Sequence, residues 1–182
     1  MTLPPLARML MLVATMAIGA VIDARASDSV LPFPHIRTVD PQIRALIDDA
    51  MESSATVRAL VERITASDVV VYVACDRDPS VRAAGRLNFM TSAGGLRYVV
   101  IRLKPKRRAA TIAMLAHELQ HAAEIADMPA IVDEASLARA YARIGYRSHG
   151  MHGGVAFDTS AAVETGRRVL EEVTALRASA GD

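Results

Sequence analysis

The sequence predicts an α+β fold, in which a small, at least partly antiparallel sheet of about three strands is followed by a packed helical half. β-branched and aromatic residues gather between residues 69 and 103. Apolar residues recur at steps of three and four before that region, and again from Pro105 to the end. Hydrophobic residues make up 52% of the chain and charged residues 23%, so the chain can bury a core and is not of the disordered class.

The N-terminal residues 1–26 have the layout of a secretory signal peptide. Arg8 supplies a positive charge, residues 9–22 are apolar or small, and residues 24–26 match a small-x-small cleavage site. The apolar run is shorter than the roughly 20 residues that a spanning helix needs. We therefore expect cleavage after Ala26, export to the periplasm or the exterior, and no stable membrane span afterwards. An uncleaved N-terminal anchor is the alternative.

The charge balance argues against nucleic acid as a partner. Lys and Arg total 21 and Asp and Glu total 20 in the whole chain. The expected mature chain lacks Arg8, Arg25 and Asp23, so its formal charge is zero, whereas nucleic-acid-binding domains usually carry a basic excess. The single cysteine, Cys75, excludes an internal disulfide.

The first part of the expected mature chain predicts an extended segment and two helices. Residues 27–39 contain two prolines and are predicted to form an extended leader to a single domain over residues 40–182. Asp40 is suited to cap a helix, and Pro41 is suited to its first turn. A break at residues 53–54 divides the helical pattern that follows into two stretches.

The central region predicts a buried strand and a hairpin. Residues 69–73 are β-branched or aromatic, as in a buried strand. Residues 86–91 alternate in character, and residues 96–103 form a further apolar run. The glycine-containing turn signal at residues 92–95 joins these two runs into a hairpin.

The C-terminal half predicts three helices. Apolar spacing indicates a long helix over residues 109–127, a second over residues 132–144 and a last one over residues 158–176. A loop rich in glycine and histidine, residues 145–155, precedes the last helix.

The motif that carries chemistry lies in the long helix. His117 and His121 are four residues apart, so their imidazoles lie on one face, one turn apart. Two nitrogen ligands at that separation can bind one tetrahedral zinc ion. Glu118 is turned by about 100° around the helix from His117, so it can act as general base on a water molecule without binding the metal.

With this motif, His117-Glu118-Leu119-Gln120-His121, the sequence resembles the zincin superfamily of metallopeptidases over roughly residues 86–165. It also resembles exported bacterial proteins of no known role that carry a HELQH-type helix. The resemblance implies one zincin-like domain that binds Zn²⁺ and hydrolyses a peptide or related amide bond in a peptide or protein substrate. The substrate is expected as an added strand along the edge of the sheet that includes residues 96–103.

The third zinc ligand stays open at this point, since a catalytic zinc usually has three protein ligands. The metzincin branch extends the motif to HExxHxxGxxH or HExxHxxGxxD, and Asp127 stands at its last position. Glu124 replaces the glycine, so a continuing helix leaves Asp127 about 9 Å beyond His121 along the axis, which disfavours this branch. Glu124 suits a role in orienting a histidine, and a plain surface carboxylate is the equal alternative.

In the gluzincin branch an acidic residue on a later helix completes the site. Asp158 resembles the acidic residue of that branch's second motif, which is followed three positions later by Ala, here Ala161, although Glu is usual at this position. Asp158 is therefore the favoured third ligand and Glu134 the alternative. The competing structural roles are a helix N-cap for Asp158 and a first-turn helix acid for Glu134.

Two other possibilities stay open. His149 or His152 is a candidate third ligand. Alternatively, one of these histidines, or Tyr141 or Tyr146, stabilises a developing oxyanion. The structural alternative for both histidines is that they are solvated loop residues.

The second function class is a non-catalytic exported module in which a degenerate motif holds metal or nothing. An open coordination position beside three ligands favours the enzyme, whereas neutralisation of Glu118 by a cation favours the module.

Overall fold

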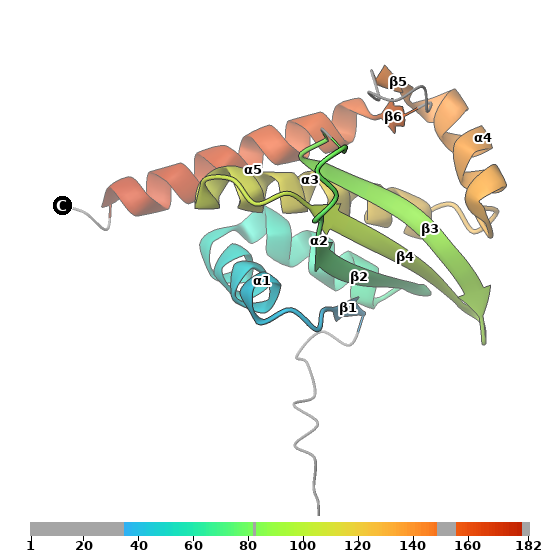
Figure 1. The fold of residues 1–182 in the computed structure, drawn as a ribbon, viewed down its shortest axis with the longest axis horizontal. Helices are drawn as coiled ribbons and strands as arrows, with labels where there is room; N and C mark the ends of the chain where they lie inside the picture. The colour runs from blue at the N-terminus through green and yellow to red at the C-terminus, as the bar shows by residue number, and fades with distance from the viewer. Residues whose placement is uncertain (1–34, 82, 149–155, 180–182) are drawn as a thin grey trace, which may run out of the picture.

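The structure, a computed structural model, describes residues 35–81, 83–148 and 156–179, and it confirms the α+β fold (Figure 1). The chain runs through β1 (Ile36–Arg37), α1 (Pro41–Ser53), α2 (Ala55–Thr65), β2 (Val69–Cys75), β3 (Gly85–Ala93), β4 (Leu96–Leu103), α3 (Arg108–Ala126), α4 (Glu134–Ile144), β5 (Tyr146–Ser148), β6 (Ala156–Asp158) and α5 (Ser160–Ser179). The predicted signal peptide and most of the predicted leader lie outside the described residues.

The main sheet has four strands in the order β1-β2-β4-β3. The hairpin prediction is confirmed, because β3 and β4 pair antiparallel, whereas β1 with β2 and β2 with β4 pair parallel. Gly94 and Gly95 turn the hairpin with φ angles of 59° and 78°, in the left-handed region that favours glycine. Residues 96–103 lie inside the sheet, and β1 and β3 form its two edges.

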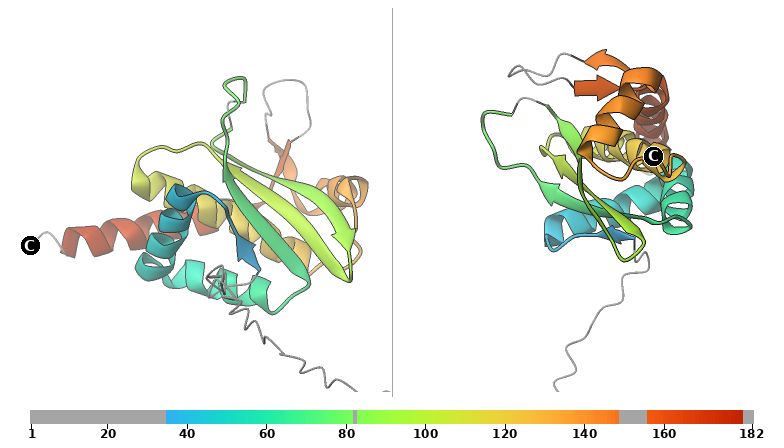
Figure 2. Two further views of the ribbon diagram at one scale, coloured as in Figure 1. Left: turned by 60° about the horizontal axis from the view of Figure 1, so that its bottom comes forward. Right: turned by 90° about the vertical axis from the view of Figure 1, so that its right-hand side faces the viewer.

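One face of this sheet packs against helices, which Figure 2 shows on one side of it. Alternate residues of β2 and β4 point to that face because side chains alternate along a strand. They are fully or almost fully buried and form the centre of the core: Val69, Val71, Val73, Val99, Ile101 and Leu103. Helix α3 lies against the sheet and also contacts α2 and α5. It is therefore buried on most of its circumference, and its apolar residues are spread around the helix and not confined to one face.

The N-terminal helices begin and end where the sequence indicates. The Asp40 side chain accepts a hydrogen bond of 2.9 Å from the backbone N–H of Gln42, and Pro41 occupies the first turn of α1. Ser54 ends α1 and caps α2 by accepting from the Val57 N–H at 3.1 Å. Both predicted helix starts are thus set by hydrogen bonds to otherwise unpaired backbone donors.

Arg97 joins the sheet to the C-terminal end of α3. The side chain is 4% exposed, and its Nε and Nη2 atoms donate to the Asp68 carboxylate at 2.7 and 2.6 Å. Its Nη1 atom donates to the carbonyl oxygens of Ile125 and Met128 at 2.7 and 2.8 Å. Because α3 has no basic residue in its last turn, Arg97 supplies the donors that its final carbonyl groups need.

The prediction differs from the structure around the last two helices. Helix α4 begins at Glu134, because Asp133 caps it in a reciprocal capping box with Ser136. The region expected as a loop, residues 145–155, contains β5, and β6 follows directly after it and pairs antiparallel with β5. Residues 149–155 lie outside the described residues. Helix α5 begins after Thr159, whose hydroxyl accepts from the Ala162 N–H at 3.1 Å.

In the described part of the chain, no helix is both long enough and apolar enough to cross a membrane.

Candidate metal centre

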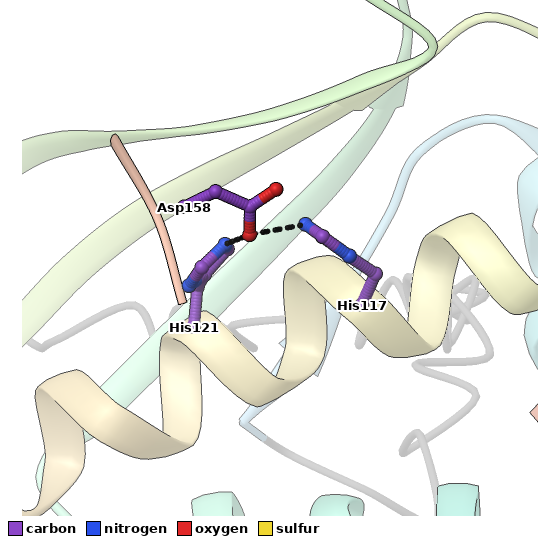
Figure 3. Close-up of side chains that lie close together, drawn as sticks. All are labelled: His117, His121 and Asp158. Carbon is purple, nitrogen blue, oxygen red and sulfur yellow. Dashed lines mark ion pairs between the residues drawn. The ribbon is translucent and has the colours of Figure 1, made fainter. Parts of the chain in front are cut away.

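Three side chains from two distant segments meet over α3 (Figure 3). His117 and His121 lie one turn apart on α3, and Asp158 is the last residue of β6. Asp158 Oδ1 lies 3.3 Å from His117 Nε2 and 3.6 Å from His121 Nε2. One ligand atom of each residue lies within 4.8 Å of the others, so this group, found among the described residues, can hold a metal ion.

The spacing of the donor atoms fits a small tetrahedral ion. Nitrogen and oxygen ligands at about 2.0–2.1 Å from a tetrahedral zinc stand about 3.3–3.4 Å from one another. The two distances from Asp158 Oδ1, 3.3 and 3.6 Å, are close to that separation. Two imidazoles and one carboxylate are a donor set that catalytic zinc uses, with the fourth position left for water or substrate.

Helix α5 comes close to the first histidine because it has a glycine there. A Cβ atom at Gly166 would lie 3.4 Å from His117 Cβ and 3.3 Å from the carbonyl oxygen of Ala113. Even a methyl group at residue 166 would therefore press on α3 at the level of His117 and require a slight shift of the neighbouring atoms. Since α5 follows directly after β6, this close packing also holds Asp158 near α3.

Asp158 reaches the histidines from the end of the β5–β6 pair. A Cβ atom at Gly145 would lie 2.6 Å from the Asp158 carbonyl oxygen, so glycine there lets the chain pass close by. The Asp158 carboxylate accepts the Thr159 N–H at 2.7 Å, while Thr159 provides the cap of α5. Burial acts to raise the pKa of Asp158, but the hydrogen bond with His121 and the charge of His117 outweigh burial and lower it.

Glu118 lies beside this group without joining it. The side chain is 4% exposed and faces the start of β3, where a Cβ atom at Gly85 would lie 2.7 Å from Glu118 Oε1. The bare backbone of Gly85 thus leaves the space that the carboxylate occupies. Burial raises the pKa of Glu118 to about 7, although the nearby His121 acts to lower it. No cation of the described residues pairs with this carboxylate in an ion pair.

Glu124 orients the second histidine. Its Oε2 atom lies 3.0 Å from His121 Nδ1, and the Tyr141 hydroxyl donates to the same oxygen at 2.9 Å. The Thr159 hydroxyl donates to Oε1 at 2.7 Å. Glu124 thus contacts Nδ1 of His121, while Nε2 of the same ring points to Asp158. Of the two roles that the sequence left open for Glu124, orienting a histidine therefore has a structural basis and a plain surface carboxylate does not.

The two histidines have opposite pKa shifts. Burial lowers the pKa of His117, and the charge of His121 lowers it further. Burial acts in the same direction on His121, but hydrogen bonds with Asp158 and Glu124 outweigh it and raise the pKa to about 9. The carboxylates of Asp158 and Glu124 therefore favour positive charge at the position between the two imidazoles.

The other candidates of the sequence have different surroundings. Glu134 Oε2 accepts a hydrogen bond of 3.1 Å from the Phe89 N–H on β3. Asp127 ends α3 and forms an ion pair with Arg63. Neither belongs to the group with the two histidines, the only such group among the described residues.

The tyrosines and loop histidines complete the comparison with the sequence. The Tyr141 hydroxyl lies within 3.1 Å of the His121 carbonyl oxygen and donates to Glu124, so it supports the histidine. Tyr146 is 49% exposed, and His149 and His152 lie outside the described residues. No sequence motif indicates the supporting roles of Thr159 and Gly85. The position of Thr159 directly after Asp158 is nevertheless a signal in the sequence that could have indicated its role.

Asp158→Ala is expected to weaken zinc binding by more than the roughly 100-fold that marks the loss of an outer partner of a ligand, because it removes a direct donor. Glu134→Ala is the matched variant and should leave the zinc dissociation constant unchanged. Competition with a chromophoric chelator measures both constants. Equal weakening by the two substitutions would contradict the assignment of Asp158.

Glu124→Ala is expected to lower zinc affinity about 10- to 100-fold while the stoichiometry stays the same, since His121 loses the partner that fixes its ring. Tyr141→Phe removes only a hydrogen bond to Glu124 and should have a smaller effect in the same direction. The same chelator competition gives the order of the variants. A Tyr141→Phe effect larger than that of Glu124→Ala would argue against this chain of contacts.

Comparison with protein-family models, curated proteins and solved structures finds no match to this chain, so the metal centre rests on its own geometry.

Proposed function

We propose that this protein is a zinc-dependent metallopeptidase that hydrolyses a peptide or related amide bond. The observation that carries the proposal is the position of Glu118, a buried carboxylate that forms no ion pair with a Lys or Arg of the described residues, on the same helix as two of three convergent metal ligands. The donor set of His117, His121 and Asp158 favours zinc. The pattern of residues 1–26 supports a site of action in the periplasm or outside the cell.

Each residue of the centre has a role in this reaction. Zinc, when bound, supplies Lewis-acid chemistry and lowers the pKa of water. Glu118 takes a proton from the attacking water and gives it to the leaving amine. Glu124 keeps the His121 ring in the orientation in which Nε2 faces the metal position.

The edge of the sheet offers a place for the substrate. Gly85, which contacts Glu118, is the first residue of β3, and β3 is the edge strand next to the centre. An extended peptide adding to β3 would present its backbone beside Glu118. β3 is an edge of the same sheet that the sequence indicated, the one that includes residues 96–103.

Elemental analysis of the chain from Ser27 onward tests the proposal, with a His117→Ala, His121→Ala double variant for comparison. We expect about one zinc per chain in the wild type and none in the double variant, because the two imidazoles are two of the three donors. Mass spectrometry of a peptide library incubated with both proteins then looks for cleavage. No zinc in the wild type after reconstitution would refute the proposal, and zinc without cleavage of any peptide would leave a metal-binding module.

A further inference from the structure

The outer edge of β3 is open beside the metal centre and closed a few residues further along. In the antiparallel pair with β4, Gly85 faces Leu103, Leu87 faces Ile101 and Phe89 faces Val99. These positions alternate with those whose N–H and C=O groups bond to β4, as the bond from the Lys104 N–H to the Ala84 carbonyl shows. The backbone groups of Gly85, Leu87 and Phe89 therefore point away from the sheet.

Within the part of the chain that the structure describes, only the first two of these positions are free to pair with another strand. Among the described residues, no hydrogen bond connects the outward groups of Gly85 or Leu87 to another element. The outward N–H of Phe89 donates to Glu134 Oε2 at 3.1 Å. Just beyond it, the Ser92 hydroxyl donates to the Val132 carbonyl oxygen at 2.8 Å, so the segment before α4 lies across the end of β3.

From this geometry we infer that Glu134 is a specificity-determining residue, which ends the substrate-pairing edge of β3 at Phe89 and so limits the length of the bound peptide on that side. The inference rests on the proposed function. A peptide that pairs with Gly85 and Leu87 has its reactive bond beside Glu118, at the Gly85 end. At about 3.4 Å per residue, about three residues fit between that point and Phe89.

The limit predicts the kind of substrate. A peptide bond close to one end of a chain fits this edge, whereas a bond in the middle of a long extended segment requires pairing beyond Phe89. The proposed centre is therefore that of an enzyme that trims short segments from a chain end. The side chain that closes the edge is the same carboxylate that the sequence left as an alternative metal ligand.

The test uses peptide hydroxamates, which chelate zinc, with the zinc-loaded mature protein. Two series of two to six residues carry the hydroxamate at the C-terminus or at the N-terminus, so that one of them extends toward Phe89. Calorimetry gives the affinity at each length. In that series we expect the affinity of the wild type to rise up to about three residues and then to level off.

Two variants of Glu134 show whether its hydrogen bond to Phe89 or its negative charge closes the edge of β3. Glu134→Ala frees the Phe89 N–H, and longer members of the series should then bind at least several-fold more tightly. Glu134→Gln keeps an oxygen that can accept from Phe89, so it should level off like the wild type. Continued gain with length in the wild type, or equal behaviour of the Ala and Gln variants, would overturn the inference.

The readout also separates this inference from the proposed hydrolysis. A plateau that depends on Glu134 in a protein that cleaves no peptide supports the closed edge and refutes the peptidase. Cleavage at the middle of long peptides, equal in wild type and Glu134→Ala, supports the peptidase and refutes the closed edge. Absence of zinc, or zinc without hydroxamate binding at any length, refutes the inference as well.

Discussion

Glu118→Gln is expected to lower kcat about 10²- to 10⁴-fold while one zinc per chain remains bound. The amide has nearly the shape of the carboxylate but cannot take a proton from water. The side chain is buried and is not one of the three convergent ligands, so the fold and the metal group should persist. Steady-state assays on a peptide identified in the library, together with elemental analysis, measure both quantities.

The control for Glu118→Gln is Glu171→Gln, which makes the same chemical change on the outer surface of α5, where Glu171 pairs with Arg167. Activity close to wild type is expected for it. If Glu118→Gln also kept full activity, Glu118 would not be the base. If it lost its zinc, the loss of activity would have a different origin.

Arg97→Met is expected to lower the free energy of unfolding by about 3 kcal/mol, at the lower end of the roughly 3–5 kcal/mol range for breaking a buried charge pair. The Asp68 side chain is 43% exposed, so solvent screens part of its loss. Most of the effect comes from the carbonyl oxygens of Ile125 and Met128, which lose a buried donor. Denaturation by urea measures the change.

Arg63→Met is the matched control, because Arg63 pairs with Asp127 at the same end of α3 but both side chains are exposed. Its expected cost is at most about 1 kcal/mol. Similar losses for the two arginine variants would show that burial of Arg97 is not what matters. If Arg97→Met does not fold, Arg97→Lys, which keeps the charge but not the fork of donors, should still be less stable than Arg63→Met.

The long elements, in which the apolar spacing repeats many times, were predictable from the sequence, and the short elements were not. The predicted helix 109–127 differs from α3 by one residue at each end, since its apolar spacing persists over five turns of about 3.6 residues. The three-residue strands β5 and β6 have no period that a pattern can reveal. The last helix was accordingly placed two residues too early, at Asp158.

The same reason limits what the sequence could say about the site. The spacing of His117 and His121 fixes their relation within one helix, so the pair is visible in the sequence. The choice between Asp158 and Glu134 depends on how the chain returns to α3, which β6 and the capping of α4 decide. Gly85 contributes by lacking a side chain, and only its distance to Glu118 in space shows that contribution.

Because Asp158 lies far from His121 in the sequence, a metal ion bound between them would also affect the stability of the fold. With a single cysteine, the protein has no disulfide to join distant parts of its chain. An ion bound between His121 and Asp158 would close the loop that contains α4, much as a covalent cross-link does, and would restrict the unfolded chain more than the folded one. Such a cross-link is reversible, so the availability of metal around the protein would set the resistance of this half of the protein to unfolding and proteolysis.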